Sequence, residues 1–127
     1  IMGSFDGEIN ILGYPEILEI KSINTYAFNN LEAPYPAHVL QCTVYMWLSG
    51  VKQTGIILYC DKSSSQFMEF RVPYKQNIID EMLEKLDYVK KMHKEDELPY
   101  DYLKCSKGNW DKYCWKKENC KRIGITK

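Results

Sequence analysis

The sequence predicts an α/β protein in which helices flank a mixed β-sheet. Segments with the alternating apolar pattern of strands are interleaved with two segments whose apolar residues recur at helical spacing. Their order along the chain is strand, strand, helix, strand, strand, helix, which is typical of an α/β layer around a mixed sheet.

The first two strands are predicted to form a hairpin within "DGEINILGYPEILEIKS", residues 6–22. We place its tight turn at Gly13 and Tyr14, ahead of a proline. That choice sets Glu8 opposite Glu19 and Asp6 opposite Lys21. Side chains alternate along a strand and opposed residues share a face, so the face of each residue can be predicted.

The hairpin has one apolar and one charged face. We expect the apolar face to pack on a core and the charged face to lie on the other side. The charged face either meets water or holds a divalent cation, since Mg²⁺ and Mn²⁺ prefer carboxylate, carbonyl and water oxygens. The apolar members are Phe5, Ile9, Ile11, Leu18 and Ile20, and the others are Asp6, Glu8, Asn10, Ile17, Glu19 and Lys21.

The remaining elements follow from local signals. The polar stretch "INTYAFNNLEAPYP" is expected to be a loop, and the next helix begins at Pro36 and stops at Gly50. "QTGIILYCD" and "SSQFMEFRV" read as a second hairpin, and residues 75–94 as a helix.

The helix from Pro36 carries three polar side chains on one face. His38, Gln41 and Tyr45 are spaced i, i+3, i+7, which at about 100° per residue keeps them within a narrow arc. By themselves these residues could simply border a core.

Composition limits the class of protein. A chain of 127 residues with 45% apolar content can bury one core, and it has neither a secretory signal nor an apolar run long enough to span a bilayer. We therefore expect a cytoplasmic protein without membrane contact. Residues 101–127 hold 8 basic and 3 acidic side chains with aromatic residues between them. This basic tail could contact a phosphate backbone, or it is a solvated surface.

The stretches "GSFDGEINILGYPEILEIKS" and "PYPAHVLQCTVYMWLSGVKQTGIILYCD" resemble the RecB-type exonuclease branch of the PD-(D/E)XK nuclease superfamily. The resemblance covers roughly residues 1–74 and depends on the order and spacing of several short motifs. It implies a restriction-endonuclease-like sheet over residues 1–95, with residues 96–127 as a basic, cysteine-containing tail. It also implies that an N-terminal helical part, with one more metal ligand, precedes residue 1.

The resemblance implies a divalent-metal-dependent DNA exonuclease that hydrolyses phosphodiester bonds. Asp6 and Glu19, with the backbone carbonyl of Ile20, would hold Mg²⁺ or Mn²⁺. Lys21 would orient water or stabilise the phosphate, and Gln41 would brace either Lys21 or the nucleophile. The substrate-binding residues would be Tyr45, which contacts a phosphate, and His38.

The tail contains Cys105, Cys114 and Cys120. Their setting is similar to the end of iron-sulfur-bearing nucleases of the same branch, although the spacing between the first two departs from the family pattern. A [4Fe–4S] cluster, structural zinc and free thiols remain open.

Two other functions compete with the nuclease. One is a non-catalytic DNA-binding module on a nuclease-like scaffold, because fold alone does not fix function. The other is a protein-interaction domain whose acidic hairpin is merely solvated. The presence of Asp6, Glu19 and Lys21 together favours the nuclease.

Overall fold

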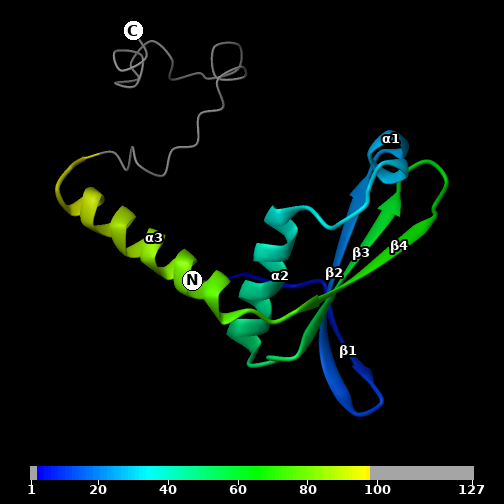
Figure 1. Ribbon diagram of the computed structural model, residues 1–127, viewed down its shortest axis with the longest axis horizontal. Coiled ribbons are helices and arrows are strands. Elements are labelled where there is room, and N and C mark those ends of the chain that lie inside the picture. The colour runs from blue at the N-terminus through cyan, green and yellow to red at the C-terminus, as the bar shows by residue number, and fades with distance from the viewer. Residues whose placement is uncertain (1–2, 98–127) are drawn as a thin grey trace, which may run out of the picture. The chain divides into compact units, whose positions relative to one another are not determined.

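The predicted strands come together in one mixed sheet (Figure 1). The computed structural model describes residues 3–97. Its elements are β1 (Gly7–Ile11), β2 (Tyr14–Ile23), α1 (Thr25–Asn29), α2 (Pro36–Ser49), β3 (Thr54–Asp61), β4 (Phe67–Pro73) and α3 (Gln76–Lys94). The strand order is β1-β2-β3-β4, with β2 parallel to β3 and the outer pairs antiparallel. The predicted α/β class, a mixed sheet flanked by helices, is confirmed.

The β1–β2 hairpin turns one position earlier than predicted. Its turn residues are Leu12 and Gly13, which both have positive φ, 54° and 89°. A type I′ turn needs positive φ at both central positions, and glycine adopts it without strain. The predicted opposition of Glu8 and Glu19 is therefore wrong, since Glu8 pairs with Ile17. Because the partner moves by two residues, each side chain keeps its predicted face.

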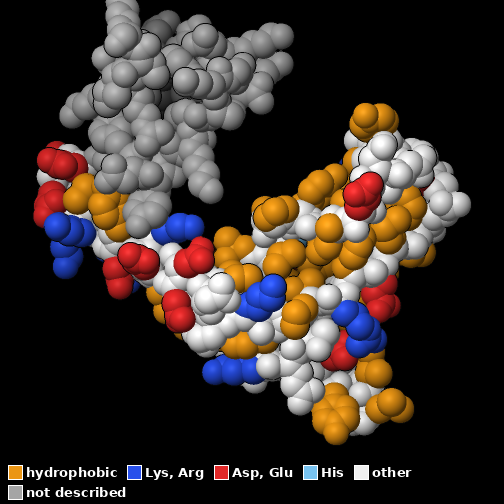
Figure 2. Space-filling view, in the orientation of Figure 1, with side chains coloured by type: hydrophobic (Ala, Val, Ile, Leu, Met, Phe, Trp, Pro, Cys, Tyr) orange, Lys and Arg blue, Asp and Glu red, His pale blue; other side chains and the backbone are white. Residues whose placement is uncertain are grey.

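The tip of this hairpin is apolar and exposed. Leu12 is 95% exposed and Tyr14 57%. Figure 2 shows hydrophobic side chains gathered at the tip, which projects from the rest of the sheet in Figure 1. The tip therefore contributes nothing to the core.

The helix α2 covers the charged face of the hairpin, which we predicted to lie on the side away from the core. Ile17 and Glu19 are 0% and 3% exposed on this face, whereas Ile20 on the predicted core face is 46% exposed. The cause lies in β3, where Gly55 and Ile57 are the partners of Ile17 and Glu19 in the parallel ladder. Gly55, which has no side chain, and the apolar Ile57 provide the surface on which α2 packs. The predicted choice of core face is wrong for β2.

The connection between β2 and α2 is not a loop throughout. Residues 25–29 form the short helix α1, because the Asn24 side chain accepts a hydrogen bond from the amide of Ala27 and caps its first turn. Phe28 and Leu31 are buried and belong to the main core. The complete core cluster is Ile17, Phe28, Leu31, Cys42, Met46, Ile57, Tyr59 and Val72.

The bounds of α2 agree with the prediction. Pro36 occupies its first turn, and Gly50 ends it in the left-handed conformation with a φ of 81°. The predicted strands at 53–61 and 64–72 and the predicted helix at 75–94 correspond to β3, β4 and α3.

The chain separates into two units, residues 1–81 and residues 82–127. The sheet, α1 and α2 all belong to the first unit. The predicted boundary between residues 95 and 96 stays a prediction. None of the helices within residues 3–97 is both long and apolar enough to cross a membrane.

Candidate functional site

Asp6 lies where the chain enters β1, beside the backbone of β2. Its Oδ2 atom accepts a hydrogen bond from the amide of Ile20 at 2.7 Å. It does not oppose Lys21 as predicted, because the ladder begins with Gly7 opposite Leu18. The amide and carbonyl of one strand residue point to the same neighbouring strand. The carbonyl of Ile20 therefore faces the side on which Asp6 lies.

Glu19 and Lys21 lie under α2 and form an ion pair. Lys21 Nζ donates a hydrogen bond to Glu19 Oε1 at 2.5 Å, and the side chains are 4% exposed for Glu19 and 20% for Lys21. The second oxygen of Glu19, Oε2, is buried and has no hydrogen-bond partner among residues 3–97. Leaving a buried acceptor unsatisfied costs about 1–3 kcal/mol. A cation or a donor group brought by a ligand would remove that cost.

The helix α2 adds two side chains to this pair. Lys21 Nζ donates a second hydrogen bond to Gln41 Oε1 at 2.9 Å, and Gln41 Nε2 donates to the hydroxyl of Tyr45 at 3.1 Å. Gln41 and Tyr45 are four residues apart and so share a helix face. We call Glu19, Lys21, Gln41 and Tyr45 the Lys21 network. The network joins Glu19, Lys21 and Gln41, which are three of the four side chains predicted to be catalytic. The fourth is Asp6.

The Lys21 network keeps several protons for a ligand. An ammonium has three N–H protons, a glutamine amide two and a tyrosine hydroxyl one. Lys21 uses two within the network and Gln41 uses one, while Tyr45 accepts a hydrogen bond there and donates none. Among residues 3–97, each of these three residues therefore has one donor left, which suits a ligand rich in acceptor oxygens.

His38 lies at the start of α2 and bonds to a residue that the sequence analysis did not select. Its Nδ1 atom is 2.7 Å from the hydroxyl of Tyr59, which also accepts the amide of Tyr35 at 3.0 Å. Burial, and then the charge of Lys21, lower the pKa of His38, although Glu19 acts in the opposite direction.

Sequence reasoning passed over Tyr59 because it appeared only as the end of the apolar run "GIILY". Of the two features that single it out, strand alternation is present in the sequence, whereas the pairing of β3 with β2 is seen only in the structure. Strand alternation places Tyr59 on the face of Gly55 and Ile57, and the parallel ladder sets it beside Lys21.

Asp6, Glu19 and Ile20 offer oxygen atoms of the kinds that a hard divalent cation binds. The donors are two carboxylates and the backbone carbonyl of Ile20, which are the ligand types that Mg²⁺ and Mn²⁺ prefer. The unpaired buried oxygen of Glu19 is the structural observation that supports the fit. Within the described part of the chain, no group of three or more His, Cys, Asp or Glu side chains gathers at one place. A cation here would complete its coordination with water, as Mg²⁺ commonly does.

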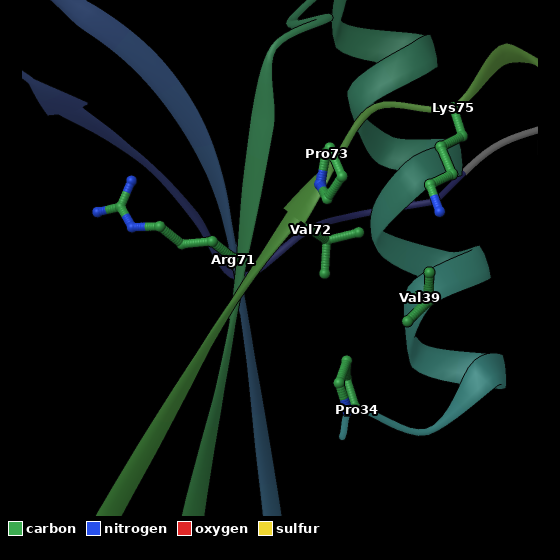
Figure 3. Close-up of a pocket in the computed structure, with 6 residues that line it drawn as sticks. All are labelled: Pro34, Val39, Arg71, Val72, Pro73 and Lys75. Carbon is green, nitrogen blue, oxygen red and sulfur yellow. The ribbon is translucent and has the colours of Figure 1, made fainter. Parts of the chain in front are cut away.

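A separate hollow of about 190 Å³ lies beside β4 and the beginning of α2 (Figure 3). It is lined by Pro34, Val39, Arg71, Val72, Pro73 and Lys75. The Arg71 side chain points away from α2 in Figure 3, and its guanidinium binds Glu16 at 2.9 Å. The hollow shares no residue with the Lys21 network and is not part of the candidate site.

The predicted cluster ligands Cys105, Cys114 and Cys120 lie outside the described residues, so that site stays a prediction. Cys42 is fully buried in α2, as expected for a small apolar side chain. Burial, with a smaller contribution from Glu19, raises the pKa of its thiol to about 11.

Comparison with known proteins adds little to this geometry. No family model and no curated protein sequence matches the chain. Among solved structures, the chain is similar to one titled "Crystal structure of SSO0001", with 24% sequence identity and a TM-score of 0.47. The similarity covers 64% of this chain and 37% of that one, so the chain spans well under half of its length. The candidate site therefore depends on the chain's own residues.

Proposed function

We propose that this chain carries the catalytic site of a divalent-metal-dependent deoxyribonuclease, an exonuclease of the RecB type, acting on DNA in the cytoplasm. The observation that carries the proposal is the buried, unpaired Oε2 atom of Glu19 beside the Lys21 ammonium. A carboxylate oxygen held in that state is suited to a cation, and the ammonium beside it is suited to a phosphate.

Asp6, Glu19 and the carbonyl of Ile20 would hold Mg²⁺ or Mn²⁺. Such an ion, when bound, lowers the pKa of a coordinated water and neutralises charge on the phosphate. Glu19 holds Lys21 in place through their ion pair, and the remaining N–H of Lys21 donates to a non-bridging phosphate oxygen as negative charge grows there.

Gln41 and Tyr45 act next to that centre. Gln41 restrains the Lys21 ammonium from the helix side, so that the direction of its free proton is set by two neighbours rather than one. The hydroxyl proton of Tyr45 is available to an adjacent phosphate, because its oxygen accepts from Gln41 within the Lys21 network. Preorganised donors of this kind avoid reorganisation during the reaction.

The proposal is tested by incubating the full-length protein with linear and circular DNA in Mn²⁺, in Mg²⁺ and in EDTA. We expect metal-dependent loss of linear DNA from its ends. Lys21→Met should slow it by about 10²–10³-fold, the usual effect of removing one electrostatic donor. Glu19→Gln should abolish it.

Glu8→Gln is the matched control, because Glu8 is an exposed acid on the same hairpin and has no assigned role. It should leave the rate unchanged. Cleavage by a folded Glu19→Gln protein at the wild-type rate would refute the proposal.

The alternative, a non-catalytic DNA-binding module, is favoured by one feature, the donors of the Lys21 network that no group among residues 3–97 accepts. It predicts retention of DNA without cleavage in every metal. Fluorescence anisotropy with a labelled oligonucleotide, run beside the cleavage assay, separates the two functions.

A further inference from the structure

The hydroxyl of Tyr59 bonds to two residues beside the Lys21 network, Tyr35 and His38. Tyr59 is 0% exposed and sits on β3 next to Lys21 in the parallel ladder. Its oxygen accepts the amide of Tyr35 and lies 2.7 Å from Nδ1 of His38. The rings of Tyr35 and Tyr59 contact the imidazole at centroid distances of 5.5 and 5.6 Å.

The direction of the bond between Tyr59 and His38 follows from hydrogen-bond accounting. If His38 donated from Nδ1, the buried hydroxyl proton of Tyr59 would have no acceptor among residues 3–97. If Tyr59 donates, its proton, its oxygen and the imidazole nitrogen are all satisfied. A buried donor left unpaired is costly, so the second arrangement prevails. Nδ1 of His38 is then an acceptor, and the neutral ring carries its proton on Nε2.

The Nε2 atom of His38 is available to a ligand. It makes no hydrogen bond within residues 3–97, and it is not among their buried unpaired atoms. His38 precedes Gln41 by three residues and Tyr45 by seven on α2, so the three side chains lie along one helix face. An N–H on His38 therefore extends the row of free donors that begins at the Lys21 network.

We infer that Tyr59 is a positioning residue, which holds His38 in the Nε2–H tautomer so that the imidazole donates a hydrogen bond to a phosphate oxygen of a bound DNA strand. The inference rests on the proposed function for the identity of the ligand. The tautomer itself does not, because it is a property of the protein without DNA.

The tautomer can be read directly. The chain contains only two histidines, His38 and His93. A His93→Gln protein labelled with ¹⁵N gives one imidazole, whose two nitrogens are distinguished by long-range ¹⁵N–¹H correlation at a pH where the ring is neutral. We expect a protonated Nε2 and an unprotonated Nδ1. A protonated Nδ1 would overturn the inference whether or not the protein cuts DNA, and this measurement needs no change at Tyr59.

The effect on the ligand is tested with Tyr59→Phe, which keeps the ring and removes the hydroxyl. We expect a five- to tenfold rise in KM for a short labelled oligonucleotide, with kcat within twofold. Tyr26→Phe is the control, since Tyr26 is 81% exposed. It should change neither constant.

A double-mutant cycle shows whether Tyr59 acts through His38. In a His38→Ala background, Tyr59→Phe should raise KM no further. An equal rise in both backgrounds would mean a merely structural role and would refute the inference. If wild-type protein binds the oligonucleotide but cuts nothing, the proposed function fails alone. The inference then stands if the Kd for DNA shows the same cycle, and falls if it does not.

Discussion

Replacing Gly55 with alanine tests how closely α2 packs on the sheet, and so what holds Gln41 against Lys21. A Cβ at Gly55 would lie closer than 3.0 Å to Cys42 Sγ, with Met46 Sδ at 3.3 Å. Ordinary contacts begin at about 3.5 Å. Cys42 is fully buried and cannot swing out of the way. The helix must therefore move outward or the sheet must bend.

The size of the effect follows from two opposing terms. Overpacking a well-filled core costs about 1–3 kcal/mol. Alanine is better than glycine inside a strand by about 0.5–1 kcal/mol, which offsets part of this. We expect Gly55→Ala to lower the free energy of unfolding by about 1–2 kcal/mol. Moving α2 should also lengthen the 2.9 Å bond between Lys21 and Gln41 and reduce DNA cleavage.

Urea denaturation followed by circular dichroism measures the change. The matched control is Gly7→Ala, because a Cβ at Gly7 meets only Leu18, at an ordinary 3.9 Å. Cys42→Ala in the Gly55→Ala protein should restore stability, with a coupling energy of about 1 kcal/mol or more. The reasoning is refuted if Gly55→Ala is as stable as Gly7→Ala, or if Cys42→Ala gives no rescue.

Three further predictions concern the rest of the described fold. Leu12→Asn should stabilise the protein by about 1 kcal/mol in urea denaturation, because Leu12 has a φ of 54° and asparagine tolerates that conformation far better; no gain would argue against the turn. Burial raises the pKa of the Cys42 thiol from its ordinary value of 9.0 to about 11, so the stability it contributes is complete below pH 9 and is lost as the pH rises towards 11. This decline should be absent from Cys42→Ala, and an identical pH profile in the two proteins would contradict it. Arg71→Met should cost about 1 kcal/mol in thermal denaturation, because it leaves Glu16 buried without its partner while Arg71 itself is half exposed; an unchanged Tm would show that the pair contributes nothing.

Strand alternation predicted which side chains of β2 share a face of the sheet. Glu19 and Lys21 were assigned to one face of β2, and the ion pair between them agrees with that assignment. The assignment of faces is correct although the turn was predicted one residue too late, at Gly13 and Tyr14. A register shift of two residues leaves every face unchanged. Helical spacing likewise put Gln41 and Tyr45 on one face of α2.

What the sequence did not predict depends on contacts between distant segments. The apolar residues of the hairpin led us to predict the wrong face as the core face. Glu19 on the other face is buried by α2 and by its partner Ile57 in β3. The pairing of β2 with β3 is a long-range event that no local pattern in the hairpin encodes. Tyr59 was missed for the same reason, because its importance comes from lying beside Lys21 and beneath His38.

The proposed nuclease requires Glu19 to bind a divalent cation. Titration calorimetry of Mn²⁺ into the full-length protein measures that binding, with Glu19→Gln and Glu8→Gln proteins measured beside the wild type. We expect binding by the wild type and by Glu8→Gln, and none by Glu19→Gln. Equal binding by all three proteins, or no binding by the wild type, would contradict it.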